Sequence, residues 1–195
     1  MVLALTSQHL SDMSAHAERV YPEECCGLMV GEISPSAGAA KDEANKLLVE
    51  LIPLENHWTP DGSAGELAGN KVGGEATYTK HRRYSIDPKD ILQVQKQARQ
   101  QGLNIIGVYH SHPDDAAVPS ECDRAQAWPE YAYVIVSVQG ISAQEMLAQG
   151  KESGSKAVDI QNWALDSNHQ FQPEAMQVSP SLTPNQASER MPISA

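Results

Sequence analysis

Hydrophobic positions along this chain follow two different periods, and each period predicts a different kind of element. Between residues 7 and 21, apolar side chains recur every three or four positions, which predicts an amphipathic helix that covers a core. These side chains are Leu10, Met13, Ala17 and Val20. A second helix is predicted from Asp87 to Gly102, because Asp-Pro supplies an N-cap and a proline in the first turn. A third is expected from Ser120 to Trp128, before Pro129.

Short apolar runs without helical spacing predict the strands. The run at residues 131–138 is the strongest, because it is rich in β-branched and aromatic side chains. The predicted strands are Cys25–Ile33, Lys46–Leu54, Tyr84–Ile86, Leu103–Tyr109, Tyr131–Val138, Val158–Leu165 and Phe171–Met176. Strands interspersed with helices favour an α/β domain.

Two stretches lack any hydrophobic period. Residues 56–77 contain many glycines and few large apolar side chains, so we expect a long loop or insertion. Residues 177–195 are rich in Ser, Pro, Gln and Asn, which predicts a disordered tail that does not contribute to the fold. The expected organisation is therefore one domain over residues 1–176 with an insertion at 56–77, followed by the tail.

Composition and charge exclude several classes of protein. The 195 residues carry a net charge of −11, which argues against a nucleic-acid partner because such binding needs a basic face. No apolar run approaches the ~20 residues that span a bilayer, and the first residues lack the basic region of an export signal. Three cysteines, with Cys25 next to Cys26, do not form a disulfide framework. We expect a soluble cytoplasmic protein without a membrane partner.

One cluster of side chains has the spacing of a metal site. His110 and His112 follow a predicted buried strand, and residues two apart in a strand point to the same face. Asp123 lies in the first turn of the next helix and can bring a carboxylate oxygen to the same point. Two imidazoles and a carboxylate suit zinc, and three protein ligands leave a fourth position for water. That number of ligands is typical of a catalytic site.

The same residues have alternative interpretations. Ser120 and Asp123 fit the capping box of a helix, and His-x-His also occurs by chance. Cys122 is another possible ligand, although it points about 100° away from Asp123 on a helix. Glu23 and Glu24 are candidates for a general base, or they form a solvated turn.

Two segments together resemble the JAMM/MPN+ metalloprotease family. The first is Pro-Glu-Glu-Cys-Cys-Gly-Leu at residues 22–28, and the second is His-Ser-His-Pro at 110–113. After six further residues comes Ser-x-x-Asp at 120–123. The bacterial and archaeal branch has Pro-x-Glu-x-Cys-Gly-Leu, which selects Glu24 rather than Glu23. The resemblance extends over residues 3–176.

The resemblance implies a fold and a set of roles. The fold is a single-domain JAMM/MPN core, a curved mixed β-sheet flanked by helices with an architecture related to cytidine deaminases. His110, His112 and Asp123 would bind one zinc ion together with a water. Glu24 would accept the proton of that water, and Ser120 would donate a hydrogen bond to the oxyanion of the tetrahedral intermediate. Because Ser120 also fits a helix cap, its two roles compete.

The function that the resemblance implies is a zinc-dependent peptidase or isopeptidase. The substrate would be an amide bond at the C-terminal Gly-Gly of a ubiquitin-like or ThiS/MoaD-type sulfur-carrier protein. The alternative is a non-catalytic MPN-type scaffold, but such members usually lack one or more ligands that are present here. Deaminase chemistry needs His-x-Glu and Pro-Cys-x-x-Cys, which this chain lacks. With only His57 and His81 near the insertion, a second zinc is not expected.

Overall fold

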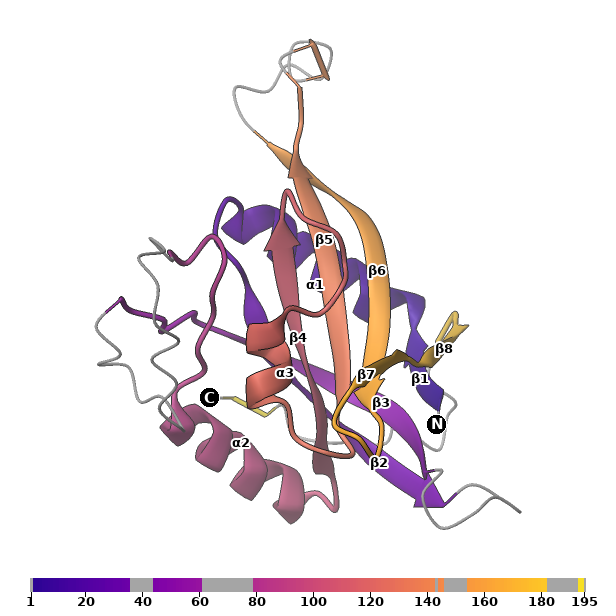
Figure 1. Ribbon diagram of the computed structural model, residues 1–195. Coiled ribbons are helices and arrows are strands. Elements are labelled where there is room, and N and C mark those ends of the chain that lie inside the picture. The colour runs from indigo at the N-terminus through magenta and orange to yellow at the C-terminus, as the bar shows by residue number, and fades with distance from the viewer. Residues whose placement is uncertain are drawn as a thin grey trace.

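The computed structural model describes residues 2–35, 44–60, 79–142, 144–145, 154–181 and 193–194. This part of the chain forms an eight-stranded mixed sheet with helices on both of its faces (Figure 1). The elements are β1 (Val2–Thr6), α1 (Ser7–Val20), β2 (Cys26–Pro35), β3 (Ala44–Leu54), α2 (Pro88–Gln100), β4 (Asn104–Pro113), α3 (Glu121–Gln126), β5 (Ala132–Gly140), β6 (Ser155–Leu165), β7 (Phe171–Pro173) and β8 (Ala175–Ser179).

The sheet is curved so that its two edges nearly meet. The strand order is β7-β6-β5-β4-β2-β3-β1-β8, so β7 and β8 form its two outer edges. Only Glu174 separates these two strands in the chain, and the two edges are therefore close together. β4 pairs in parallel with β5, and β1 pairs in parallel with both β3 and β8, while the other pairs are antiparallel. The expected curved mixed sheet is confirmed.

Two apolar clusters lie on opposite faces of the sheet. Met29 belongs to the cluster under α1, whereas its neighbours Leu28 and Val30 belong to the cluster under α2. This alternation follows from the two-residue period of a strand. α1 packs against β5 and β6 as well as β3 and β4, and α2 packs against β4 and β2 (Figure 1).

The helix ends have local causes that the sequence predicts. The Asp87 side chain accepts a hydrogen bond of 2.8 Å from the backbone N–H of Lys89, and Pro88 occupies the first turn of α2. After α2, Gly102 adopts a φ of +70°, which glycine tolerates without strain. The Thr6 side chain caps α1 in a reciprocal pair with His9.

Two strand predictions need correction, and one strand was not predicted. Tyr84–Ile86 is not a strand, because Ser85 bonds to His57 and Asn56 instead, and the apolar side chains serve burial rather than strand pairing. The run 171–176 divides at Glu174 into β7 and β8, which pair with different strands. β1 was not predicted, since five residues give little signal before a partner is known.

The tail differs from its prediction in two places. β8 continues to Ser179, so residues 177–179 belong to the sheet. Ile193 is buried among side chains of α2 and the sheet, with 6% of its surface exposed. Residues 61–78, which include most of the predicted insertion, and residues 182–192 lie outside the described residues. Within the described ranges, every helix is too short or too polar to cross a bilayer.

Candidate metal centre

Two histidines at the end of β4 present their Nε2 atoms to one point. β4 extends through His110 and His112 to Pro113, so both residues lie within the last part of the strand rather than beyond it. Their Nε2 atoms are 3.1 Å apart, and both residues are buried. The two-residue spacing places both rings on the same face, as predicted.

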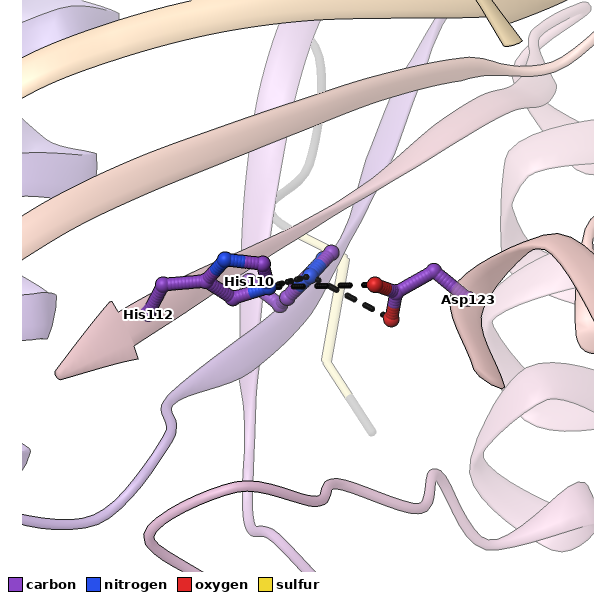
Figure 2. Close-up of side chains that lie close together, drawn as sticks. All are labelled: His110, His112 and Asp123. Carbon is purple, nitrogen blue, oxygen red and sulfur yellow. Dashed lines mark hydrogen bonds and ion pairs between the residues drawn. The ribbon is translucent and has the colours of Figure 1, made fainter. Parts of the chain in front are cut away.

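Asp123 reaches the same point from α3. Its Oδ1 lies 3.5 Å from Nε2 of His110, and its Oδ2 lies 3.8 Å from Nε2 of His112. Figure 2 shows the carboxylate of the helix facing the two rings of the strand. Of the described residues, these three form a group whose candidate ligand atoms all lie within 4.8 Å of one another.

The separations fit a tetrahedral metal ion. With zinc–ligand bonds of about 2.0–2.1 Å, the ligand atoms of a tetrahedron are about 3.3 Å apart. The two Nε2 atoms are 3.1 Å apart, and each lies 3.5 or 3.8 Å from a different oxygen of Asp123, which is close to that value. Two neutral imidazoles and one carboxylate form a donor set that zinc favours, with one position left for water or substrate.

The surroundings of each ligand favour metal binding. Nδ1 of His112 lies 2.8 Å from the carbonyl oxygen of Ala116, so Nδ1–H donates and Nε2 keeps its lone pair. The ring of His110 stacks on Tyr84 at a centroid distance of 4.6 Å, and its Nδ1 is buried without a hydrogen-bond partner among the described residues. Burial lowers the pKa of His110 to about 4, which keeps this ring neutral at pH 7.

The carboxyl group of Asp123 is held in its ionised form. Burial alone would raise its pKa, but His110 and hydrogen bonds with His112 and Ser120 outweigh that effect and hold the pKa well below its usual range. The backbone N–H of Ser120 donates to Oδ2 of Asp123 at 2.6 Å. A metal ion therefore meets a negative ligand that needs no deprotonation.

Glu24 is buried beside the ligands, whereas Glu23 is exposed. Burial raises the pKa of Glu24 to about 8, while His112 opposes this rise and Asp123 adds to it. A carboxyl group with a pKa near neutrality can both take up and release a proton at physiological pH. The structure thus brings Glu24, and not Glu23, to the site that the family motif implies.

The position of Glu24 depends on residues that sequence reasoning missed. The hydroxyl oxygen of Ser111, between the two histidines, accepts a hydrogen bond of 2.8 Å from the N–H of Cys25. The Asn56 side chain donates to the carbonyl oxygen of Glu24 at 3.0 Å, and the N–H of Glu24 donates to the carbonyl oxygen of Lys80 at 2.7 Å. Ser111 lies inside the His-Ser-His motif. A polar side chain between two candidate ligands was the sequence feature that could have indicated its structural role.

Ser120 is the N-cap of α3 and lines the same pocket. Its hydroxyl oxygen accepts a hydrogen bond of 3.2 Å from the N–H of Asp123, so the cap uses the oxygen as an acceptor. A serine hydroxyl also has one hydrogen to donate. The two roles that the sequence set in competition are therefore compatible.

Two adjoining pockets open at the metal centre. The first, here the arginine pocket, has a volume of about 150 Å³ and is lined by Glu24, Arg82, Arg83, Tyr84, His112, Asp115, Ser120, Cys122, Asp123 and Gln126. The second, here the aromatic groove, has a volume of about 120 Å³. It is lined by Leu28, Trp58, Tyr84, Ser85, Ile86, Ile91, Ile105, Val108, Asp123, Gln126, Trp128, Tyr131 and Tyr133. The two share Tyr84, Asp123 and Gln126, so each borders the metal ligands.

The cysteines and the remaining histidines lie outside the group of ligands. Cys122 lines the arginine pocket, but its sulfur is not part of the three-residue group. All three cysteines are free, and burial raises the pKa of Cys25 to about 11, which keeps it a neutral thiol. The ring of His57 lies 3.9 Å from Asp90. No second group of three metal-ligating side chains occurs in the described ranges.

Most of the chain matches a known family. Residues 6–149 match the domain described as prokaryotic homologues of the JAB domain. The chain belongs to this prokaryotic JAB family. The resemblance to JAMM/MPN+ proteins, drawn from the two motifs around Glu24 and His110, is thereby confirmed.

Two relatives with assigned names share parts of this chain. The probable TtuB-protein conjugate cleaving protease of Thermus thermophilus is 36% identical over 153 residues, which cover 78% of this chain and 80% of that protein. The desampylase of Haloferax volcanii is 40% identical over 58 residues, or 29% of this chain and 42% of the relative. The second match thus spans less than half the length of the desampylase.

Two solved structures share the fold of this chain. A protein from Desulfitobacterium hafniense superposes with a TM-score of 0.63 at 21% identity, covering 96% of this chain and 99% of its own. A protein from Salinibacter ruber gives a TM-score of 0.55 at 26% identity, covering 93% and 94%. At 21% identity, the likeness to the Desulfitobacterium hafniense protein concerns the fold alone.

Proposed function

We propose that this protein is a zinc-dependent peptidase or isopeptidase that hydrolyses an amide bond at the C-terminal Gly-Gly of a ubiquitin-like or ThiS/MoaD-type sulfur-carrier protein. The observation that carries the proposal is the convergence of His110, His112 and Asp123 beside the buried carboxyl group of Glu24. The names of the two relatives, one a protease that cleaves TtuB conjugates and one a desampylase, support this class of reaction.

Each side chain has a chemical task in this proposal. A zinc ion held by His110, His112 and Asp123 would lower the pKa of water from ~15.7 to about 7 and polarise the scissile carbonyl group. Glu24 accepts the proton of the attacking water and returns it to the leaving amine, a task that suits its raised pKa of about 8. One equivalent of zinc per chain follows from the one ligand group in the described ranges.

Ser120 serves the oxyanion. Its hydroxyl oxygen is fixed by the Asp123 N–H, and its hydrogen remains available to donate toward the pocket. A donor that is held in place before the reaction stabilises developing negative charge without reorganisation. Ser120 thus supports both the start of α3 and the transition state.

The aromatic groove suits an extended, apolar C-terminal tail. Apart from Asp123, all the side chains that line it are uncharged, and they include Trp58, Ile91 and Trp128. Glycines at the end of such a tail let its backbone approach the metal ligands closely, because they have no side chain. The groove therefore supports a substrate that presents an extended, apolar C-terminal tail.

The non-catalytic scaffold is the weaker alternative. A scaffold gains nothing from a buried carboxyl group, which costs free energy to desolvate. All five functional positions are filled here by residues that line or border one pocket. We also propose that the protein acts in the cytoplasm, because its three cysteines are free, as expected in a reducing compartment.

The proposal can be tested with one defined substrate. A ThiS/MoaD-type carrier is extended beyond its Gly-Gly by a short peptide and incubated with zinc-loaded protein. Intact mass should show cleavage after Gly-Gly, and a chelator should stop the reaction until zinc is restored. Absence of cleavage by fully zinc-loaded protein, over several carriers, would overturn the proposal.

A further inference from the structure

The loop between β4 and α3, residues 114–118, is held by side chains from two other strands. After β4 the chain turns back across β5 toward α3 (Figure 1). The hydroxyl group of Ser137 on β5 donates a hydrogen bond of 2.7 Å to the carbonyl oxygen of Asp115. The indole N–H of Trp163 on β6 donates a hydrogen bond of 3.0 Å to the carbonyl oxygen of Ala117. Donors from separate strands thus fix two carbonyl groups that are two residues apart.

The carbonyl group between these two contacts a proposed zinc ligand. The carbonyl oxygen of Ala116 lies 2.8 Å from Nδ1 of His112 and accepts a second hydrogen bond, also of 2.8 Å, from the backbone N–H of Val118. Both lone pairs of this oxygen are therefore used. With its hydrogen on Nδ1, the ring of His112 keeps the lone pair of Nε2 for a metal ion.

Hydrophobic burial contributes little to the position of this loop. The side chains of Asp114, Asp115 and Ala116 are exposed, and that of Ala117 is small, although it is only 2% exposed. Asp115 also pairs with Arg82 at 3.1 Å, but the two side chains are 55% and 64% exposed, and such exposed pairs contribute little to stability. The position of the Ala116 carbonyl group therefore depends mainly on hydrogen bonds to the neighbouring backbone.

The start of the loop is held by a separate set of bonds. The N–H of Asp114 donates to the carbonyl oxygen of Val138 at 2.8 Å. The Asp114 carboxylate accepts hydrogen bonds from the N–H of Gly140 at 3.3 Å and from the hydroxyl group of Tyr21 at 3.0 Å. These bonds fix where the chain leaves β4, two residues before the carbonyl group that contacts the histidine.

The two donors lie on the same face of the sheet as His112. Ser137 is paired with His112 across β4 and β5, and Trp163 is paired with Tyr133, four residues before Ser137 on β5. Because paired residues share a face and side chains alternate along a strand, all of these side chains point to one side. Ser137 is only 3% exposed within the apolar run of β5, and a hydroxyl group is costly to bury there unless it is hydrogen-bonded.

We propose that Ser137 and Trp163 are positioning residues for zinc binding, which hold the carbonyl group of Ala116 where it fixes the tautomer and the orientation of the His112 ring. This role rests on the zinc site of the proposed function and assigns two residues outside the ligand group to it. Loss of either donor releases a carbonyl group next to Ala116, so the contact with Nδ1 weakens. The ring then also adopts the tautomer with its hydrogen on Nε2, which cannot bind the metal through that atom.

The first measurement is the affinity for zinc. Zinc-loaded protein is titrated with a chelator of known affinity, and the Kd is compared between wild type, Ser137→Ala and Trp163→Phe. The second variant keeps an aromatic ring and lacks the N–H donor. Each should raise the Kd about 10-fold, the lower end of the effect of residues that support metal ligands, because the Ala116 carbonyl group itself remains. The double variant should raise the Kd further than either single variant.

A matched control separates this role from a purely structural one. Ser14 donates a hydrogen bond of 2.9 Å to the carbonyl oxygen of Leu10 within α1, so Ser14→Ala removes the same kind of bond away from the metal centre. Its Kd for zinc should equal that of the wild type. Ser137→Thr keeps a hydroxyl donor and should retain most of the affinity. Thermal unfolding is recorded for every variant, since a purely structural role would lower stability and leave the Kd of the folded protein unchanged.

A second readout does not involve the metal. In metal-free protein with ¹⁵N-labelled histidine, at a pH where the ring is neutral, the ¹⁵N chemical shifts show which ring nitrogen carries the hydrogen. The wild type should have it on Nδ1 of His112, and the signals absent from His112→Gln identify this residue. Ser137→Ala and Trp163→Phe should each shift these signals toward a mixture of the two tautomers, and Ser14→Ala should not.

The outcomes distinguish the two positioning residues from the zinc site itself. If both single variants keep the wild-type affinity for zinc, or if the tautomer of His112 is the same in both as in the wild type, the positioning role is wrong while the proposed function stands. If the wild-type protein binds no zinc, the proposed zinc site fails and the positioning role fails with it.

Discussion

The Nζ of Lys46 lies 3.4 Å from Oε1 of Glu174, and the two side chains are only 1% and 3% exposed. Lys46 belongs to β3, and Glu174 is the one residue between β7 and β8. The other carboxylate oxygen of Glu174 accepts a hydrogen bond of 2.8 Å from Asn162 on β6. This buried pair therefore ties β3 to the connection between the two edge strands β7 and β8.

We expect Glu174→Ala to destabilise the protein by about 3–5 kcal/mol, because it leaves the buried charge of Lys46 without this carboxylate. The double variant Lys46→Met/Glu174→Leu should recover much of the loss, since apolar residues can replace a buried pair. Urea unfolding of the single and double variants measures both effects. A single variant as stable as the wild type would show that the pair does not stabilise the contact between β3 and the β7–β8 connection.

The metal ligands predict the metal content. Wild-type protein should contain about one equivalent of zinc, and His112→Ala should lose it, because removal of one of three protein ligands leaves an incomplete site. His57→Ala is the matched control, since its ring lies by Asp90 outside the ligand group. Elemental analysis gives the content, and full zinc in His112→Ala would show that the ligand assignment is wrong.

Glu24 separates catalysis from metal binding. Glu24→Gln keeps the size of the side chain but removes its basicity, so cleavage should fall by at least ~10²-fold while zinc content and thermal stability stay close to wild type. Glu23→Gln should remain active, because Glu23 is exposed. If Glu23→Gln were inactive instead, the motif would be aligned one residue out of register.

The C-terminal residues should stabilise the fold. Ile193 is 6% exposed, its N–H donates to Glu50 at 3.0 Å, and the Gln97 side chain bonds to both the N–H and the carbonyl oxygen of Ser194. Ile193→Ala should therefore lower the free energy of unfolding by about 2 kcal/mol, the lower end for core truncations of this size, because only one short segment is held. Ile33→Ala, at a site that is 46% exposed, is the matched control.

Chemical denaturation measures both isoleucine variants.

The sequence alone predicted that truncation after Met176 would leave the melting temperature unchanged. The structure predicts a decrease instead, because truncation removes most of β8 and Ile193 together. An unchanged melting temperature would restore the original expectation.

His16 should make stability depend on pH. Its ring is buried with Nδ1 2.9 Å from the hydroxyl group of Tyr109, and burial lowers its pKa to about 4, with Arg19 adding to the effect. Above pH ~6.5 both the folded and unfolded states are neutral at this residue. Between pH ~6.5 and about 4 only the unfolded state takes up the proton. As the pH is lowered through this range, the free energy of unfolding therefore decreases by up to roughly 3 kcal/mol, and the decrease levels off below about pH 4.

The variant His16→Gln should therefore lose less stability than the wild type over that pH range. His57→Gln, whose side chain is 36% exposed, controls for the loss of a histidine as such. Urea unfolding at several pH values gives the comparison. Parallel pH profiles for wild type and His16→Gln would contradict the assignment to His16.

Elements with local signals could be predicted from the amino-acid sequence. The three-to-four spacing before Val20, the Asp-Pro start of α2 and the β-branched run of β5 each depend on neighbours within a few residues, and all three elements occur as predicted. His110, His112 and Asp123 could also be selected in advance, because strand alternation and the next helix start limit where their side chains point. Glu24 needed the family motif as well.

Contacts between distant segments could not be predicted from local sequence patterns. Residues that are far apart in the chain meet where β8 pairs with β1, where Lys46 contacts Glu174 and where Ile193 is buried. No local hydrophobic period specifies such partners. Ser111 against Cys25 and Tyr84 against His110 likewise depend on contacts between separate elements. The physical reason is that hydrogen bonding and hydrophobic burial are satisfied by any suitable partner, and the closure of the whole sheet selects which one lies within reach.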